Sequence, residues 1–323
     1  PERLRFLAIT ASNLDEFFMV RVGGLEMLTK HGSAKRDPAG MLPEEQLQAI
    51  SRRTHEINRD QYTCFLIDLE PKLQEAGIVR VRPNELTPAQ FQSLELVFQN
   101  EIFSVLTPMV VSSADDFPLL VNRTLNVCVQ LRPEAGNDKQ PRFAVIPFGR
   151  GASRFVTLPS AGGYAYMLLE DVVAAFIERF FPGEEVVETV PFRITRNAEL
   201  EIREDMAADL LAEMEEVLDA RRESPCVRLE IAHRVTSGLL NFLKGILNVA
   251  ERDVYAAPGP LDLSAFMKLA DLHGFDGLRY EPWPPRPSPL VDPRVSMFEN
   301  ISRRDILLFH PYESFEPVVR LLE

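Results

Sequence analysis

Long apolar runs are missing from this sequence of 323 residues. The nearest approach, residues 168–181, is interrupted by Glu170, Asp171, Glu178 and Arg179. A membrane-spanning helix needs about 20 apolar residues, so we expect no transmembrane segment. With 46% hydrophobic and 26% charged residues, the chain is also too apolar for a disordered protein. We expect a soluble protein of about two domains.

Cysteine and basic side chains are both scarce. The three cysteines, Cys64, Cys128 and Cys226, are far apart, which excludes a disulfide framework and a zinc spacing and indicates reduced thiols. We expect a cytoplasmic location, with membrane association left open. Lys and Arg number 35 against 48 Asp and Glu, a net charge of −13. Proteins that bind nucleic acids need a basic face, so we expect no nucleic-acid partner.

The common catalytic and nucleotide-binding motifs are absent too. The sequence contains neither Gly-x-x-x-x-Gly-Lys-Ser/Thr nor Gly-x-Gly-x-x-Gly, and neither Gly-x-Ser-x-Gly nor His-Glu-x-x-His. The five histidines never lie at metal-ligand spacing; they are His31, His55, His233, His273 and His310. The histidine spacing therefore predicts no histidine-ligated metal site, and none of these motifs identifies a catalytic residue.

The first third of the sequence has helical periodicity. Apolar residues recur at helical spacing over residues 4–28, with an interruption near Ser12-Asn13. A second helix should start at Pro43 and be kinked or ended by Pro71. A third should run from Thr87 to about residue 106. We expect a helical N-terminal bundle or hairpin over residues 1–107.

After residue 107 the pattern changes to short strands mixed with helices. The predicted strands are 119–132, 143–148, 154–158, 191–195, 227–231 and 305–309, and the predicted helices are 167–180, 204–221 and 236–247. The prolines around Trp283 predict an extended strap. The fold class is thus α followed by α+β: a mixed α/β head domain over 108–311, and the start of a further domain over 312–323.

Acidic clusters are the first candidates for chemistry. Pairs of carboxylates such as Asp115-Asp116 can hold Mg²⁺ or transfer protons, which would suit a metal-dependent hydrolase. Asp115-Asp116 also suits an ordinary turn. The acidic residues of the predicted amphipathic helix 204–221 suit a helix face in contact with water. A metal-dependent hydrolase is therefore the least favoured interpretation of this chain.

The sharpest local motif is Ser12-Asn13-Leu14-Asp15-Glu16. Its spacing favours a helix N-cap, with Ser12 or Asn13 accepting a backbone N–H and Asp15 or Glu16 completing a capping box. The alternative is an anion site, in which free N–H groups and the Asn13 amide bind a phosphate. Spacing alone favours the cap.

Two stretches near the start carry a family resemblance. They are Glu2-Arg3-Leu4-Arg5-Phe6-Leu7-Ala8-Ile9 and Ser12-Asn13-Leu14-Asp15-Glu16-Phe17-Phe18-Met19-Val20-Arg21-Val22. Further stretches are Phe117-Pro118, Arg154-Phe155-Val156-Thr157-Leu158-Pro159, Phe192-Arg193-Ile194-Thr195-Arg196-Asn197-Ala198-Glu199, Val227-Arg228-Leu229-Glu230, Gly259-Pro260-Leu261-Asp262-Leu263 and Asp305-Ile306-Leu307-Leu308-Phe309-His310-Pro311-Tyr312-Glu313-Ser314-Phe315. Together they resemble the N-terminal and head domains of bacterial polyphosphate kinase.

The resemblance implies a phosphotransferase that moves the terminal phosphate of ATP onto inorganic polyphosphate, and back to ADP, through a phosphohistidine. It also implies Mg²⁺ with the ATP, and a homodimer or higher oligomer to which the head domain contributes. Asn13 matches the family asparagine that contacts the ATP phosphates, with Asp15 and Glu16 left as capping and support. The phosphorylated histidine and the magnesium ligands belong to a C-terminal half that this chain does not contain, so His310 receives no role.

Two interpretations of the whole chain remain open at this stage. In the first, it is the N-terminal and head portion of a polyphosphate kinase, inactive alone and dimeric at micromolar concentration. In the second, it is a non-enzymatic scaffolding or regulatory paralogue that dimerises and binds nucleotide or polyphosphate weakly. The apolar face of the last helix, over residues 314–322, needs cover, which favours the first interpretation.

Overall fold

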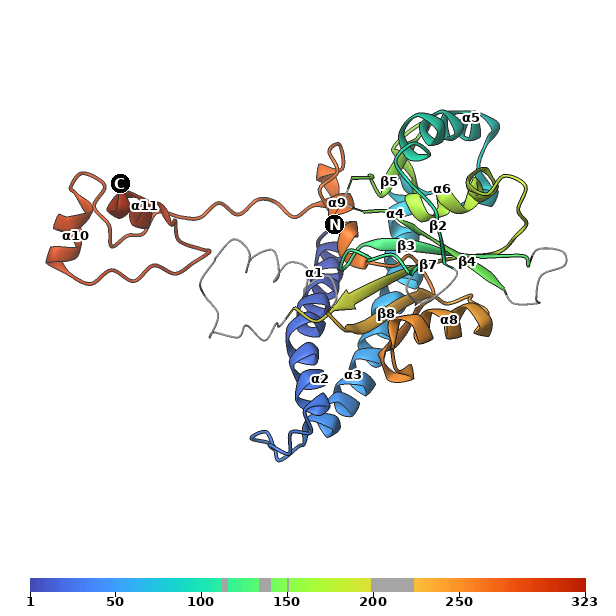
Figure 1. The fold of residues 1–323 in the computed structure, drawn as a ribbon. Coiled ribbons are helices and arrows are strands. Elements are labelled where there is room, and N and C mark those ends of the chain that lie inside the picture. Colours follow the sequence, from blue (N-terminus) through green and yellow to red (C-terminus); the bar gives the residue numbers. More distant parts are fainter. Residues whose placement is uncertain (112–115, 134–140, 150, 199–223) are drawn as a thin grey trace, which may run out of the picture. The chain divides into compact units, whose positions relative to one another are not determined.

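The computed structural model describes residues 1–111, 116–133, 141–149, 151–198 and 224–323. Most of the chain falls into two compact units, Arg3–Asp271 and Leu272–Glu323. Figure 1 shows the order of their helices and strands along the chain. The expected fold class is confirmed, because a helical N-terminal region precedes a mixed sheet with helices.

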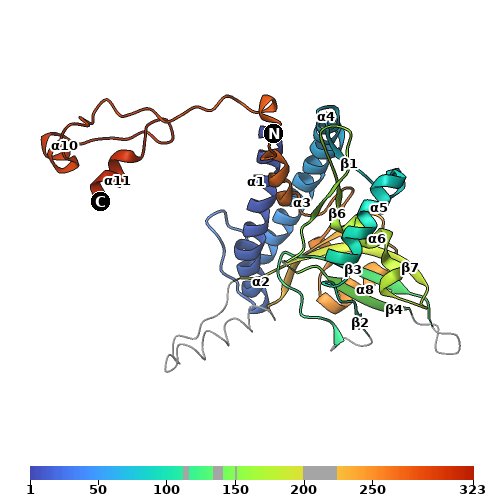
Figure 2. The ribbon, with the colours of Figure 1, turned by 90° about the horizontal axis from the view of Figure 1, so that it is seen from above.

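The first helices form an antiparallel hairpin (Figures 1 and 2). Its elements are α1 (Glu2–Phe17), a π-helical turn (Phe18–Val22), α2 (Gly23–Lys30) and α3 (Pro43–Thr63). Pro43 is the first residue of α3, as the sequence predicts, and the Glu45 side chain accepts a hydrogen bond from the Leu42 N–H at 2.7 Å. This capping contact sets the start of α3.

The helix does not break at Ser12-Asn13, so the predicted interruption and N-cap are wrong. Both residues lie inside α1 and are exposed. An interior residue already uses its N–H within the helix, so no free N–H groups are left there to bind an anion. Ser and Asn disfavour helices when their side chains bond the local backbone; no hydrogen bond of either side chain is found among the described residues.

The second helix does not end at Pro71, where the sequence predicts a kink or an end. After α3 the chain forms a π-helical segment, Cys64–Leu69, and then α4, Glu70–Glu75. Proline has no N–H to donate. Pro71 lies in the first turn of α4, directly after the backbone hydrogen bonds change from the π-helical to the α-helical pattern. The third helix is α5 (Pro88–Val97) with a π-helical extension, Phe98–Ile102; Thr87 caps it by accepting from the Gln90 N–H at 3.3 Å.

A six-stranded sheet, in the order β2-β4-β3-β7-β8-β9, forms the centre of the first unit. Its strands are β2 (Met109–Val111), β3 (Leu125–Leu131), β4 (Arg142–Pro147), β7 (Val186–Arg196), β8 (Cys226–Ala232) and β9 (Val254–Ala257). Neighbours are antiparallel except β8 and β9, which are parallel. In the β7–β8 pair Arg193 lies opposite Glu230.

A second, three-stranded sheet joins the helical region to the head. It consists of β1 (Ile78–Arg80), β6 (Tyr164–Leu168) and β5 (Phe155–Leu158), in that order. Strand β1 comes from the predicted N-terminal domain and pairs in parallel with β6 of the predicted head. One compact unit therefore contains both, and the boundary at residue 107 stays a prediction.

Helices cover both faces of the six-stranded sheet. Helix α8 (Ser237–Leu247) packs Leu239, Leu243 and Leu247 against apolar side chains that include Phe192 and Ile194. Helix α6 (Leu169–Ala175) lies on the other side, as Figure 1 shows. The π-helical turn after α1 contacts β7 and β8, and α3 contacts β9. The first unit ends with α9 (Met267–Ala270).

Four further predicted elements differ or cannot be compared. The strand expected from residue 119 begins only at Leu125. The helix expected from residue 167 begins only at Leu169, because the preceding residues complete β6. Residues 305–309 form no strand; Leu307 and Phe309 are exposed, and no neighbouring strand supplies a hydrogen-bonded partner among the described residues. The predicted helix 204–221 lies outside the described residues.

The second unit contains α10 (Met297–Arg303) and α11 (Glu316–Leu322), the latter as expected. The proline-rich stretch before them is extended, and its one bridge joins Arg286 to Glu313. The proline rings exclude a regular ladder there, in agreement with the predicted strap.

Candidate functional site

Asn13 lies on the outward side of α1. Its side chain is exposed and makes no hydrogen bond with any residue that the structure describes. Ile9 and Phe17, four residues before and after it on the same helix face, are 40% and 37% exposed. The Asn13 amide is therefore a free donor and acceptor with exposed apolar side chains on both sides.

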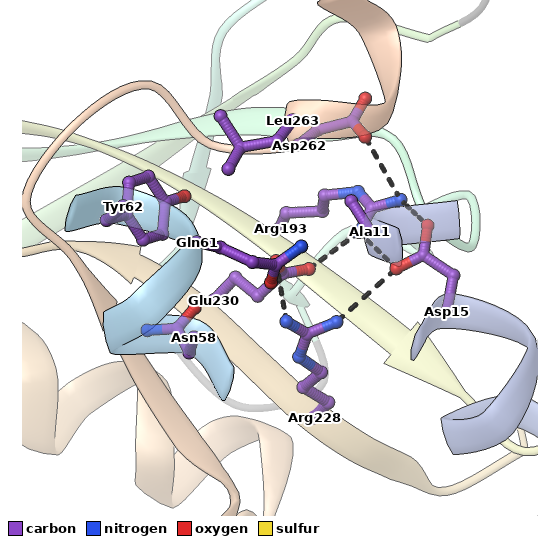
Figure 3. A pocket seen from close by; sticks show the side chains of 10 residues that line it. All are labelled: Ala11, Asp15, Asn58, Gln61, Tyr62, Arg193, Arg228, Glu230, Asp262 and Leu263. Atoms are coloured by element: carbon purple, nitrogen blue, oxygen red, sulfur yellow. Dashed lines mark hydrogen bonds and ion pairs between the residues drawn. The ribbon is translucent and has the colours of Figure 1, made fainter. Parts of the chain in front are cut away.

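Asp15, only two residues further on, is buried. It is 4% exposed and faces the six-stranded sheet. The prediction that it caps a helix is wrong, because α1 has already begun at Glu2. Its partners are arginines from the sheet (Figure 3).

Those arginines come from the alternation of side chains along β7 and β8. Phe192 and Ile194 pack with α8 on one face of the sheet, so Arg193, between them, points to the other. Arg228 and Glu230 lie on the same face as Arg193, since Arg193 and Glu230 are directly opposite in register. This charged face is covered by the hairpin of α1 and α3.

We call Asp15, Arg193, Arg228, Glu230 and Asp262 the buried ion cluster. Arg193 is bidentate to Asp15, with Nη1 2.8 Å from Oδ1 and Nη2 2.5 Å from Oδ2. Its Nη1 also donates to Glu230 Oε2 at 2.6 Å. Arg228 bridges the same two carboxylates, at 3.4 Å from Asp15 and 3.1 Å from Glu230. The cluster thus joins α1 to two neighbouring strands.

Asp262 closes the cluster from the loop after β9. Its Oδ1 is 3.7 Å from Arg193 Nη2. Burial by itself would raise the pKa of Asp262, but Arg193 and Arg154 outweigh it, and the pKa is lowered. Burial opposes the charge of Arg193, yet Glu230 and Asp15 raise its pKa well above the ordinary value. Asp262 and Arg193 are therefore both charged at neutral pH.

Arg228 is held by aromatic rings as well as by carboxylates. Its guanidinium carbon is 4.8 Å from the centre of the Phe18 ring and 4.9 Å from that of Tyr255. Such contacts stabilise a desolvated cation. Arg228 Nε has no hydrogen-bond partner among the described residues, and the same holds for Gln61 Nε2, which lines the same small pocket.

A neighbouring buried pair, Arg154 and Glu170, extends the network through the loop. Arg154 donates to Glu170 at 2.6 Å and to the Asp262 carbonyl at 2.8 Å. Its guanidinium also lies 5.7 Å from the Phe266 ring. The network therefore links α1, the sheet, the loop at 261–262 and α6.

The described residues offer positioning rather than catalytic chemistry. In the part of the chain that the structure describes, no group of three or more His, Cys, Asp or Glu side chains is arranged so that it could hold a metal ion. The carboxylates of the buried ion cluster are already paired with arginines, so the residues present do not fit a magnesium site. Of the acidic pairs, Glu184 and Glu185 are paired with Arg142 and Arg132, while Asp115 lies outside the described residues.

Among the described residues, no histidine forms a hydrogen bond or ion pair with another histidine or with a residue of the buried ion cluster. His55 stacks on Tyr255, with Nε2 3.0 Å from the Val254 carbonyl, and His310 lies 3.1 Å from the Glu313 carbonyl. The other three, His31, His233 and His273, are exposed. The cysteines are free thiols, and burial raises the pKa of Cys226 to about 11.

Sequence reasoning missed the buried ion cluster. The available signal was the charge at alternate positions of two apolar strands, Arg193 in one and Arg228 and Glu230 in the other. Alternation of this kind normally marks a strand with one face in water.

No helix among the described residues has the length and apolarity to cross a membrane.

Comparisons with known proteins agree with this architecture. The family model for the polyphosphate kinase N-terminal domain matches residues 1–81, and that for the polyphosphate kinase middle domain matches residues 89–269. Both α1 and the strands of the buried ion cluster fall within these matches. This chain belongs to the polyphosphate kinase family.

Curated relatives and a solved structure point the same way. Polyphosphate kinases of Rhodopirellula baltica and Halalkalibacterium halodurans are each 40% identical over 100% and 98% of this chain. The chain covers 46% of each of those proteins, or about half of their length. The crystal structure of polyphosphate kinase from Porphyromonas gingivalis matches 99% of this chain and 44% of its own, with a TM-score of 0.77 and 25% identity.

Proposed function

We propose that this chain forms the N-terminal and middle parts of an enzyme that transfers the γ-phosphate of ATP reversibly onto inorganic polyphosphate. The observation that carries the proposal is that two polyphosphate kinase family models match consecutive parts of the chain, residues 1–81 and 89–269. The chain is also 40% identical to named polyphosphate kinases. The transfer would proceed through a phosphohistidine. That histidine belongs to the half of the relatives that this chain does not match.

The role proposed for this part is to supply Asn13 to the ATP phosphates. A carboxamide can donate its N–H₂ to a phosphate oxygen without carrying a charge of its own. The exposure of Asn13, its lack of a protein partner among the described residues and the exposed Ile9 and Phe17 beside it support this role. Apolar neighbours would shield such a hydrogen bond from water once a further domain covers them.

Stabilisation of the transferred phosphoryl group requires cations. The buried ion cluster does not offer them, because its arginines are engaged by Asp15, Glu230 and Asp262. We therefore assign the magnesium ligands and the catalytic arginines to the unmatched half. The acidic balance of this chain, −13 overall, is consistent with that division.

We also propose a homodimer. Strand β2 is an edge strand of the six-stranded sheet, and its Met109 and Val110 are 44% and 47% exposed. An edge strand with exposed apolar side chains favours association. Sedimentation of the enzyme tests it: a dimer at micromolar concentration supports the proposal, and a monomer contradicts it.

The test of the Asn13 role is Asn13→Ala in the intact enzyme that contains this chain. Loss of a phosphate hydrogen bond should weaken the use of ATP by about 1–3 kcal/mol, measured as kcat/KM for ATP. Asn100→Ala is the matched control, since Asn100 is also an exposed helical asparagine. Unchanged kinetics for Asn13→Ala would remove Asn13 from the ATP site.

A further inference from the structure

Asn13 and Asp15 face opposite sides of α1. Successive helical residues are about 100° apart, so a separation of two positions places them about 200° apart around the axis. Asn13 is exposed, whereas Asp15 is 4% exposed and held by the sheet. Whatever fixes the direction of Asp15 therefore also fixes the direction of Asn13.

Arg193 holds Asp15 in a way that is sensitive to rotation of the helix. Both of its Nη atoms bond the two carboxylate oxygens, at 2.8 and 2.5 Å. A bidentate contact is planar and directional, unlike the attraction between two point charges. Turning α1 about its axis would break at least one of the two bonds.

Arg193 is itself fixed on the sheet. Its Nε donates to the Arg123 carbonyl at 3.0 Å, and its Nη1 donates to Glu230 at 2.6 Å. Arg228 approaches Asp15 from the next strand and is held between Phe18 and Tyr255. Phe18 directly follows α1, so Arg228 contacts this helical segment at two points.

From this geometry we infer that Arg193 and Arg228 are positioning residues for Asn13: by holding Asp15 they fix the rotation of α1 and thus the direction of the Asn13 amide. The inference rests on the proposed role of Asn13. Buried ion pairs contribute little net stability compared with apolar packing of the same volume. What this bidentate pair adds is a single orientation of α1.

A merely structural role and a positioning role predict different kinetics. If the cluster only stabilises the fold, its loss lowers the amount of active enzyme and leaves the KM for ATP unchanged. If it positions Asn13, the KM for ATP rises while the KM for polyphosphate stays constant. The two effects are separable because each KM is independent of enzyme concentration.

The experiment is Arg193→Lys in the intact enzyme, which keeps the charge and removes the bidentate geometry. We expect the KM for ATP to rise on the order of tenfold, since small misplacements of a binding group are costly. Asp15→Asn, of nearly the same shape, gives a second variant if Arg193→Lys does not fold. Arg80→Lys is the matched control: Arg80 is half-buried between Asp171 and Glu70, at 3.0 and 3.4 Å, and has no hydrogen bond or ion pair with α1 among the described residues.

The decisive measurement is the double variant with Asn13→Ala. If Arg193 acts through Asn13, Arg193→Lys changes the KM for ATP in the native background and has no further effect once Asn13 is alanine. Equal effects in both backgrounds would overturn the positioning inference and leave the role of Asn13 intact. No effect of Asn13→Ala alone would instead reject the proposed role of Asn13 in binding ATP, on which the inference rests.

Discussion

Asn13 and Asp15 illustrate how much the surroundings decide at the scale of single residues. Both are small polar residues of one motif, yet one is exposed and the other is ion-paired with two arginines. The exposed residue is available to a ligand and the buried one is not. Under the proposed function, the motif combines a binding residue, Asn13, with its anchor, Asp15.

Asp253, beside Arg252 at the start of β9, makes a pH-dependent contribution to stability. Burial raises the pKa of Asp253 to about 6, while Arg252, 3.6 Å away, lowers it in part. The folded carboxyl thus keeps its proton at a pH where the unfolded chain, with an ordinary pKa of 3.8, has released it. Stability is therefore lost as the pH rises from about 4 to above 6.

Asp253→Asn should remove this penalty. Discounting for partial exposure, we expect the free energy of unfolding to rise by about 1–2 kcal/mol at pH 7.5 and by about zero at pH 4. Urea unfolding at both pH values measures it. Asp60→Asn is the control, because Asp60 is 71% exposed. A difference that is the same at both pH values would contradict the assignment.

At the scale of elements, the join between α1 and α2 is held against the end of β7. The Ala198 N–H donates to the Met19 carbonyl at 3.0 Å. Gly23, the first residue of α2, lies directly against Asn197, because a Cβ built on Gly23 would overlap the Asn197 side chain. The absence of a side chain at Gly23 allows this close approach.

Gly23→Ala should therefore destabilise the protein by about 1–3 kcal/mol through overpacking. Asn197 cannot move away easily, because it is 3% exposed and its backbone bonds Pro225 and Ser224 at 3.1 and 2.7 Å. Gly245→Ala is the matched control in α8, with nothing within 4 Å of its Cβ. There we expect a gain of about 0.5–1 kcal/mol from helix propensity. Thermal unfolding that ranks the two variants in the opposite order would refute the argument.

At the scale of the whole molecule, some charged side chains are buried in ion pairs and others lie on the surface. The three most buried arginines of the network, Arg154, Arg193 and Arg228, are all paired with carboxylates. Under the proposed function, such an arrangement orients the helix that carries Asn13, while these three arginines are not available to neutralise a transferred phosphate. Catalysis would then depend on groups in the half of the relatives that this chain does not match.

The 323-residue chain, incubated with Mg²⁺ and γ-labelled ATP, should acquire no acid-labile phosphate. The reason is that the proposed mechanism assigns the phosphorylated histidine to the unmatched half of the relatives, and no metal-binding group is found among the described residues. The intact enzyme is the positive control, and circular dichroism checks that the chain is folded. Acid-labile label on the chain would place the phosphorylated histidine within it and contradict the proposed division of labour.

Much of the fold followed from local patterns. Helical spacing predicted the hairpin, and Pro43 and Thr87 correctly marked two helix starts. Alternation predicted strands within β7 and β8. These signals succeed because capping and side-chain periodicity depend on neighbouring residues alone. The predicted strand at 305–309 failed because a strand needs a partner, which the local pattern does not specify.

In the candidate site, too, some features follow from local sequence patterns and others from tertiary structure. The sequence by itself determined the motif that contains Asn13, and it determined that Arg193, Arg228 and Glu230 alternate with apolar residues. Alternation shows that a strand has two different faces, but not what covers the polar one. Only the tertiary structure decided that α1 covers it, which turned charges expected in water into a buried ion cluster around Asp15. The reason is that burial depends on elements far apart in the sequence, whereas periodicity does not.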